Sequence, residues 1–194
     1  MSLRKQYLCL AQNQFTLGNY AISTIQPQDI EVIRNWRNAQ MTVLRQSSPI
    51  EYSQQVEYYS SVIWPSMEQC NPDNILFTFF DNNKRIGYGG LVHISWQDKR
   101  AEMSFLLDSD LTGNDKEYGK HFTAFIQLML TVAFEHLNFH KLFTETYATR
   151  VHHISVLESC GLVLEGTMRD HIILENKYVD SLLHSVLNNN NSNV

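Results

Sequence analysis

Residues 102–121 read EMSFLLDSDLTGNDKEYGKH, and this stretch decides the fold. Its first six residues form the apolar run of a buried strand. Polar turn residues follow at 108–110, then a glycine-containing loop at 113–121, and a helix pattern opens at Phe122. A strand that passes through such a loop into a helix builds an anion site, because backbone N–H groups and the helix dipole both point at the ligand.

The chain on either side of this stretch predicts a mixed sheet with helices on both faces. Apolar residues at three- and four-residue spacing predict a helix over about 116–137. A strand at 141–148, a short helix at 153–160 and a hairpin of strands 163–170 and 178–186 follow. Upstream, a strand at 20–25 precedes helices at 30–38 and about 52–63, the second ended by Trp64-Pro65. Strands at 75–80, 85–96 and 101–107 then form a meander, so the predicted order is β-α-α-β-β-β-α-β-α-β-β.

The composition is typical of one globular domain. A net charge of −5 argues against a general nucleic-acid or anionic-membrane binder. No apolar run approaches the roughly 18 residues that span a bilayer, and the N-terminus lacks the apolar core of a signal peptide. The three scattered cysteines show no metal-type spacing, so we expect reduced thiols and no metal. We therefore expect a cytoplasmic protein with a single domain over 1–187 and a disordered, asparagine-rich tail over 188–194.

Six segments between about residues 21 and 186, taken in order, resemble the GNAT N-acetyltransferases. The resemblance is to the branch that includes the bacterial ribosomal-protein N-terminal acetyltransferases. No single segment is specific, but six in the right order are. They are 33–38 (IRNWRN), 86–91 (IGYGGL), 101–105 (AEMSF), 132–142 (VAFEHLNFHKL), 154–162 (ISVLESCGL) and 165–170 (EGTMRD).

The resemblance implies an α/β fold, with a central mixed, mostly antiparallel, twisted sheet of six to seven strands flanked by about four helices. It also implies an acyltransferase with acetyl-CoA as co-substrate, which lies where the fourth and fifth family strands splay apart. The backbone of Phe105, Leu106 and Leu107 would then pair with the pantetheine arm. The pyrophosphate would lie on the loop residues Lys116, Glu117, Tyr118, Gly119, Lys120 and His121.

Acetyl transfer from a thioester to an amine needs a base for the amine, a donor for the oxyanion and stabilisation of the leaving thiolate. Glu102 is the first candidate base, because it lies on the strand that borders the presumed cleft. Its carboxylate could instead face solvent or pair with Arg100. His93 on the preceding strand is the alternative base, and the Leu106 N–H is the candidate oxyanion donor.

Three positions depart from the family pattern. His121 is bulky where a small residue normally lets phosphate approach the backbone. Arg150 and Leu157 stand where many members have an asparagine and a tyrosine that protonates the thiolate, so Ser155 or Tyr147 becomes the candidate for that task. These departures motivate an alternative function, a catalytically inactive acyl-CoA-binding protein of the same fold.

Trp36, Arg37 and His184 are the candidate acceptor-binding residues, and Asp180 shares a strand face with His184. Trp36 could equally be a core residue. Arginines and aromatic rings suit a sugar or a phosphorylated acceptor. We therefore rank a nucleotide-linked amino sugar first, a protein N-terminus second, and a polyamine or antibiotic third. The acceptor is thus a small-molecule or peptide amine, and a monomer and a homodimer both stay open.

Overall fold

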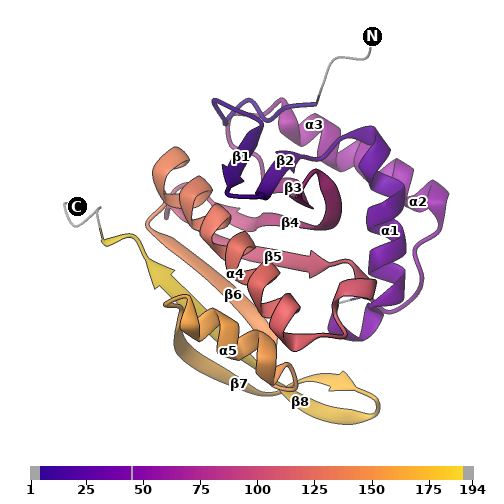
Figure 1. The fold of residues 1–194 in the computed structure, drawn as a ribbon, viewed down its shortest axis with the longest axis vertical. Helices are drawn as coiled ribbons and strands as arrows, with labels where there is room; N and C mark the ends of the chain where they lie inside the picture. Colours follow the sequence, from indigo (N-terminus) through magenta and orange to yellow (C-terminus); the bar gives the residue numbers. More distant parts are fainter. Residues whose placement is uncertain (1–4, 45, 190–194) are drawn as a thin grey trace.

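The computed structural model describes residues 5–44 and 46–189, which form one eight-stranded sheet with helices on both faces (Figure 1). All neighbouring strands are antiparallel except β5 and β6, which are parallel. The strands, in their order across the sheet, are β1 (Gln14–Leu17), β2 (Tyr20–Thr24), β3 (Ile75–Asp81), β4 (Lys84–Ser95), β5 (Arg100–Leu107), β6 (Lys141–Tyr147), β8 (Lys177–Leu187) and β7 (Val163–Leu174). The expected mixed, mostly antiparallel sheet is therefore confirmed.

The helices are α1 (Ile30–Ala39), α2 (Tyr52–Tyr58), α3 (Trp64–Met67), α4 (Asp115–Leu130) and α5 (Val151–Ser159). Turns of π-helix at Tyr59–Ile63 and Thr131–His136 extend α2 and α4. Short 3₁₀ turns occupy Pro27–Asp29, Met41–Val43 and Ser109–Leu111. Within the described part of the chain, no helix is long and apolar enough to span a bilayer.

The N-terminal edge of the sheet contains one strand more than the sequence predicts. β1 is only four residues long and pairs with β2 through a turn in which Gly18 adopts φ +58°. A four-residue strand with one buried side chain, Phe15, gives too short an alternation to be recognised in a sequence.

Two helix boundaries also differ from the prediction. The helix expected to end at Trp64-Pro65 continues to Met67, because a π-turn precedes α3 and places Pro65, which has no N–H, in the first turn of α3. α4 begins at Asp115, next to the start expected at about residue 116, because the Asn114 side chain caps it, so most of the loop expected at 113–121 is helical instead.

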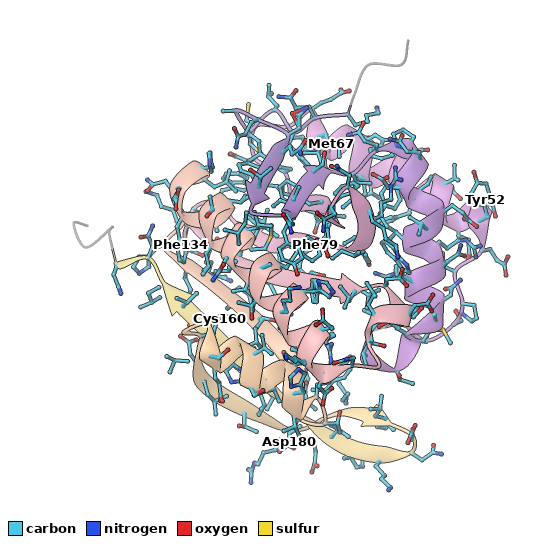
Figure 2. All side chains as sticks on the ribbon, in the orientation of Figure 1. Tyr52, Met67, Phe79, Phe134, Cys160 and Asp180 are labelled. Atoms are coloured by element: carbon cyan, nitrogen blue, oxygen red, sulfur yellow. The ribbon has the colours of Figure 1, made fainter. Side chains whose placement is uncertain are left out.

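The side chains of β3 alternate between two helical layers. Phe79 lies edge-to-face with Phe125 of α4, with ring centroids 5.3 Å apart. Thr78 points to the opposite face and donates a hydrogen bond to the carboxylate of Asp29, which directly precedes α1. Figure 2 shows Phe79 in the interior and Tyr52 of α2 at the outer surface. The sheet therefore separates α4 from α1.

A wedge opens in the middle of the sheet between β5 and β6. The two strands pair at only three positions, Arg100↔Lys141, Ala101↔Leu142 and Glu102↔Phe143. Beyond Glu102 they separate, although β5 stays paired with β4 as far as Leu107. The splayed central strands that the resemblance implies are thus present.

The last described residues are held against the sheet. Asn188, which the sequence assigns to the disordered tail, is buried. Its Nδ2 donates to the Phe139 carbonyl, and its backbone N–H donates to the His140 carbonyl. The predicted tail residues 190–194 lie outside the described residues.

Candidate active site

The wedge between β5 and β6 forms a cleft that both faces of the sheet help to line. Its walls come from β4, β5, β6, α4, and the segments around α1 and α5. Phe105 of β5 stacks on Phe122 of α4, with ring centroids 4.6 Å apart, and Phe122 stacks on His153 of α5 at 4.1 Å. The cleft therefore has an aromatic wall on the α4 side and an opening toward α1 at Arg37.

Glu102 and His93 form a pair at the apex of this cleft. The Glu102 Oε2 atom lies 2.7 Å from His93 Nδ1, and both residues line the cleft. The Glu102 side chain is 13% exposed and that of His93 is 64% exposed. A bulge in β4 between Val92 and Ser95 directs His93 there, and His93 adopts φ +47°, which is uncommon for a residue other than glycine.

This pair has the arrangement of a general base. A carboxylate only accepts hydrogen bonds, so Nδ1 of His93 carries the proton in this contact. When the ring is neutral, its Nε2 atom then keeps a lone pair that can take a proton from an incoming amine. The two candidate bases predicted separately are thus in contact with each other. The alternative partner of Glu102, Arg100, has its Nε 3.6 Å from Asp98.

The backbone of β5 presents only alternate residues to the wedge. The Asp108 N–H donates to the Ile86 carbonyl of β4 at 2.7 Å. Alternate residues of a paired strand direct their backbone groups to the same neighbour, so Leu106 also faces β4. Phe105 and Leu107 are left to face the wedge. The Leu106 N–H, which was the predicted oxyanion donor, is thus directed at β4, and the Phe105 N–H faces the wedge instead.

At the N-terminus of α4, where the pyrophosphate was expected, the side chain of Asn114 caps the helix. The Asn114 Oδ1 atom accepts the N–H groups of Lys116 and Glu117 at 3.0 and 3.2 Å. The Lys120 Nζ lies 3.8 Å from a Glu117 carboxylate oxygen at the surface. Gly119 faces His152 of α5, and a Cβ at this glycine would lie 3.4 Å from the His152 Nε2.

The ring of His121 points inward, away from the expected phosphate loop. Its Nδ1 lies 3.0 Å from the hydroxyl of Tyr20 on β2, and burial lowers the pKa of His121. The ring of His121 is therefore packed against β2, and not over the start of α4 where its bulk was expected to hinder phosphate.

The structure also corrects three predicted contacts. Trp36 is a core residue, 5% exposed, and lines neither the cleft nor the second pocket described below. Ser155 is exposed and donates its hydroxyl hydrogen to the His152 carbonyl of its own helix. His184 is fully buried, with its Nε2 3.5 Å from Glu158 of α5. Asp180 of β8, labelled at the lower edge of the molecule in Figure 2, accepts the backbone N–H of Asp170.

Sequence reasoning missed a polar cluster that links α4 to α5. The Tyr118 hydroxyl lies 2.6 Å from His153 Nδ1 and accepts a hydrogen bond from Arg150 Nη2 at 3.1 Å. Burial raises the pKa of Tyr118, partly offset by Arg150, and burial lowers the pKa of His153 well below its ordinary value. Arg150 and His153 line the cleft, as does the predicted Tyr147. Arg150 and His153 are three residues apart at the start of α5, and this spacing was the sequence signal that could have linked them.

A second pocket of about 500 Å³ adjoins the cleft on the α1–α2 side. It shares Arg37, Val92 and Ser104 with the cleft. Its other lining residues are mostly tyrosines and amides, namely Ile50, Gln54, Gln55, Tyr58, Tyr59, Asn74, Leu76 and Tyr88. Among the described residues that line it, none is an aspartate or a glutamate. This pocket is therefore suited to neutral or anionic groups.

Comparisons with known proteins agree with this geometry. The family model for an acetyltransferase (GNAT) domain matches residues 22–183. No curated protein matches the sequence significantly. Among solved structures, the spermidine N-acetyltransferase from Vibrio cholerae in complex with CoA and spermine has a TM-score of 0.77 at 20% identity, covering 88% of this chain and 96% of that chain. A dodecameric structure of spermidine N-acetyltransferase from the same organism has a TM-score of 0.73 at 20% identity, covering 88% and 95%.

Proposed function

The chain belongs to the acetyltransferase (GNAT) domain family and is an acetyl-CoA-dependent N-acetyltransferase, and from this premise we propose its catalytic base and its acceptor. Acetyl-CoA lies in the wedge between β5 and β6, and the amine arrives from the pocket beside α1 and α2. The amine attacks the thioester carbonyl directly, so no covalent enzyme intermediate is formed.

The Glu102–His93 pair carries this proposal. It lies at the apex of the wedge, where the reacting carbonyl of a bound thioester would be, and it joins a carboxylate to an imidazole at 2.7 Å. His93 accepts the proton of the ammonium group, and Glu102 orients the ring and stabilises the resulting imidazolium. The Phe105 N–H group donates a hydrogen bond to the oxyanion of the tetrahedral intermediate.

The acceptor that suits the second pocket best is a nucleotide-linked amino sugar. Arg37 offers a guanidinium for phosphate, and Gln54, Gln55 and Asn74 offer amides for sugar hydroxyls. A polyamine carries several positive charges and is best bound by carboxylates, which are absent from the described lining of this pocket. A polyamine, the acceptor type named for the structural relatives, is thus the second choice here, together with a peptide N-terminus as in the ribosomal-protein branch.

Release of CoA, followed with a thiol reagent, tests the proposal on three acceptors: a nucleotide-linked amino sugar, spermidine and a short peptide with a free N-terminus. We expect turnover of the sugar, and about 100-fold lower kcat in Glu102→Gln with unchanged acetyl-CoA binding. Faster turnover of spermidine would overturn the acceptor assignment. Acetyl-CoA binding without turnover of any acceptor would favour the catalytically inactive alternative.

For the assembly we propose a monomer or a homodimer in the cytoplasm. β7 is a twelve-residue edge strand, and such an edge can pair with a second copy. The free cysteines Cys9, Cys70 and Cys160 suit a reducing compartment. Light scattering on the purified protein distinguishes these states from a dodecamer like that of the relative.

A further inference from the structure

The cluster of Tyr118, His153 and Arg150 lies where the cleft passes between α4 and α5. Tyr118 and His153 are 8% and 7% exposed, and their polar atoms meet at 2.6 Å. His153 lines the cleft, whereas Leu157, one turn further along α5, is fully buried. Figure 1 shows α4 and α5 side by side, with β6 behind them. The cluster is therefore a buried polar network beside the space assigned to the acyl donor.

The hydrogen-bond partners fix where the protons lie. A guanidinium has no acceptor, so the Tyr118 oxygen accepts the bond from Arg150 Nη2. The single hydroxyl hydrogen of Tyr118 then donates to His153 Nδ1. A neutral His153 consequently carries its own proton on Nε2.

Burial and nearby positive charge favour the neutral form of the His153 ring. Its pKa is lowered first by burial and then by the positive charge of Arg150 and by the neighbouring His152 and His184. The carboxylate of Glu158 approaches His184, at 3.5 Å. No hydrogen bond from His153 Nε2 to another described residue is found. The Nε2–H group is thus positioned as a donor to a ligand in the cleft.

We propose that His153 protonates the leaving CoA sulfur and that Tyr118 resupplies the proton. When the tetrahedral intermediate collapses, the C–S bond breaks and its electron pair goes to sulfur, which takes the Nε2 proton. Nδ1 takes the phenol proton at the same time, and Arg150 holds the resulting phenolate until solvent returns a proton. His153 is the catalytic residue, and Tyr118 and Arg150 are positioning residues that act through it. This inference rests on the proposed acetyl transfer in the wedge.

A second tyrosine–histidine pair, which joins β2 to α4, provides a matched control. The Tyr20 hydroxyl lies 3.0 Å from His121 Nδ1, and neither residue lines the cleft. Tyr20→Phe and Tyr118→Phe remove the same hydroxyl group from the same kind of pair. Only the Tyr118 pair reaches the acyl donor through its histidine.

The first measurement compares steady-state kinetics of the full-length chain and these two variants, with acetyl-CoA and the acceptor that the panel identifies. We expect kcat to fall about 100-fold in Tyr118→Phe, with little change in the acetyl-CoA dissociation constant, and to stay near the wild-type value in Tyr20→Phe. Equal losses in the two variants, or a loss confined to acetyl-CoA affinity, would overturn the proposal.

The second measurement needs no acceptor. The thiolate absorbance of bound CoA is titrated against pH in the wild-type chain and in His153→Leu. An N–H donor at sulfur stabilises the thiolate, so we expect the bound thiol to ionise about one pH unit lower in the wild-type chain. Identical titrations would show that His153 does not contact sulfur and would overturn the inference. A shifted titration without turnover of any acceptor would instead retain the His153 contact and refute the proposed function.

Discussion

Arg37 of α1 donates from Nη1 to the hydroxyl of Tyr88 on β4 at 2.6 Å, which fixes a guanidinium at the passage between the cleft and the second pocket. Its Nε donates to Gln46 Oε1 at 3.2 Å. Both contacts involve neutral partners, so the positive charge is held in place without being neutralised by them. An anionic acceptor group entering the second pocket would meet this charge.

Replacement of Arg37 by lysine should weaken acceptor binding more than acetyl-CoA binding. Lysine keeps the charge but loses the planar donor fork, and a hydrogen bond to a charged group contributes about 1.5–3 kcal/mol, which corresponds to roughly 10- to 100-fold in KM. Arg34→Lys on the same helix is the control, because Arg34 pairs with Glu31 instead. Equal acceptor KM values in the two variants would remove Arg37 from the acceptor site.

The buried carboxylate of Asp29 should be a major source of stability. It is 2% exposed and accepts hydrogen bonds from the Gln26 N–H, the Thr78 hydroxyl and Arg85 Nε. Asp29→Ala leaves these donors without their acceptor, so we expect urea unfolding to show a loss of about 3 kcal/mol. Asp98→Ala, which breaks an exposed pair with Arg100, should cost less than about 1 kcal/mol. A small loss for Asp29→Ala would mean that water replaces the carboxylate.

Local sequence patterns predict the strands that border the wedge, and the family resemblance implies the wedge itself, but neither predicts which groups meet in it. The apolar run at 102–107 and the alternation of apolar and polar residues in the other strands predict the sheet, because the burial pattern of a strand is local in the sequence. Glu102 and His93 were candidates one by one, yet their pairing depends on a bulge with a positive φ at a histidine, which has no local signal. Tyr118 and His153 lie on two different helices and are 35 residues apart in the chain, and no periodicity relates them.

Burial of polar side chains explains the remaining differences. Trp36 and His184 carry groups that could bind an acceptor, but both lie in the interior. An aromatic or imidazole ring can occupy a core position as readily as a binding site. Only the packing of α1 and α5 on the sheet decides which of these places the ring takes. Ser155 is the opposite case, because it is exposed but its hydroxyl donates to a carbonyl of its own helix.

Two buried histidines should make stability depend on pH. Burial lowers the pKa of His153 well below its ordinary value and also lowers that of His121. The unfolded chain then takes up protons below about pH 6.5 that the folded chain does not, so the unfolding free energy falls as the pH drops from there toward the lower folded pKa values. Each histidine contributes a slope of at most about 1.4 kcal/mol per pH unit.

Urea unfolding between about pH 7.5 and pH 5.5 measures this dependence, in a range above the ordinary titration of carboxylates. His153→Phe keeps a ring against Phe122 but removes the titrating group, so its pH slope should be shallower even though its absolute stability is lower. An unchanged slope would show that His153 does not contribute to the pH dependence.

The Asn114 side chain accepts hydrogen bonds from the backbone N–H groups that we assign to the pyrophosphate. Its removal should therefore affect the stability of the fold and the binding of the cofactor in opposite directions. Its Oδ1 accepts the N–H groups of Lys116 and Glu117, so Asn114→Ala should lower the stability of the unliganded chain by about 1 kcal/mol. The same two groups then become available to phosphate oxygens, and acetyl-CoA should raise the melting temperature more in the variant than in the wild-type chain.

Asp108→Ala is the control, because it removes the cap of the neighbouring 3₁₀ turn. In this variant, acetyl-CoA should raise the melting temperature no more than in the wild-type chain. If Asn114→Ala loses stability without gaining a larger cofactor shift, the pyrophosphate binds away from the start of α4, and the exposed Lys116 and Lys120 side chains are the next groups to test.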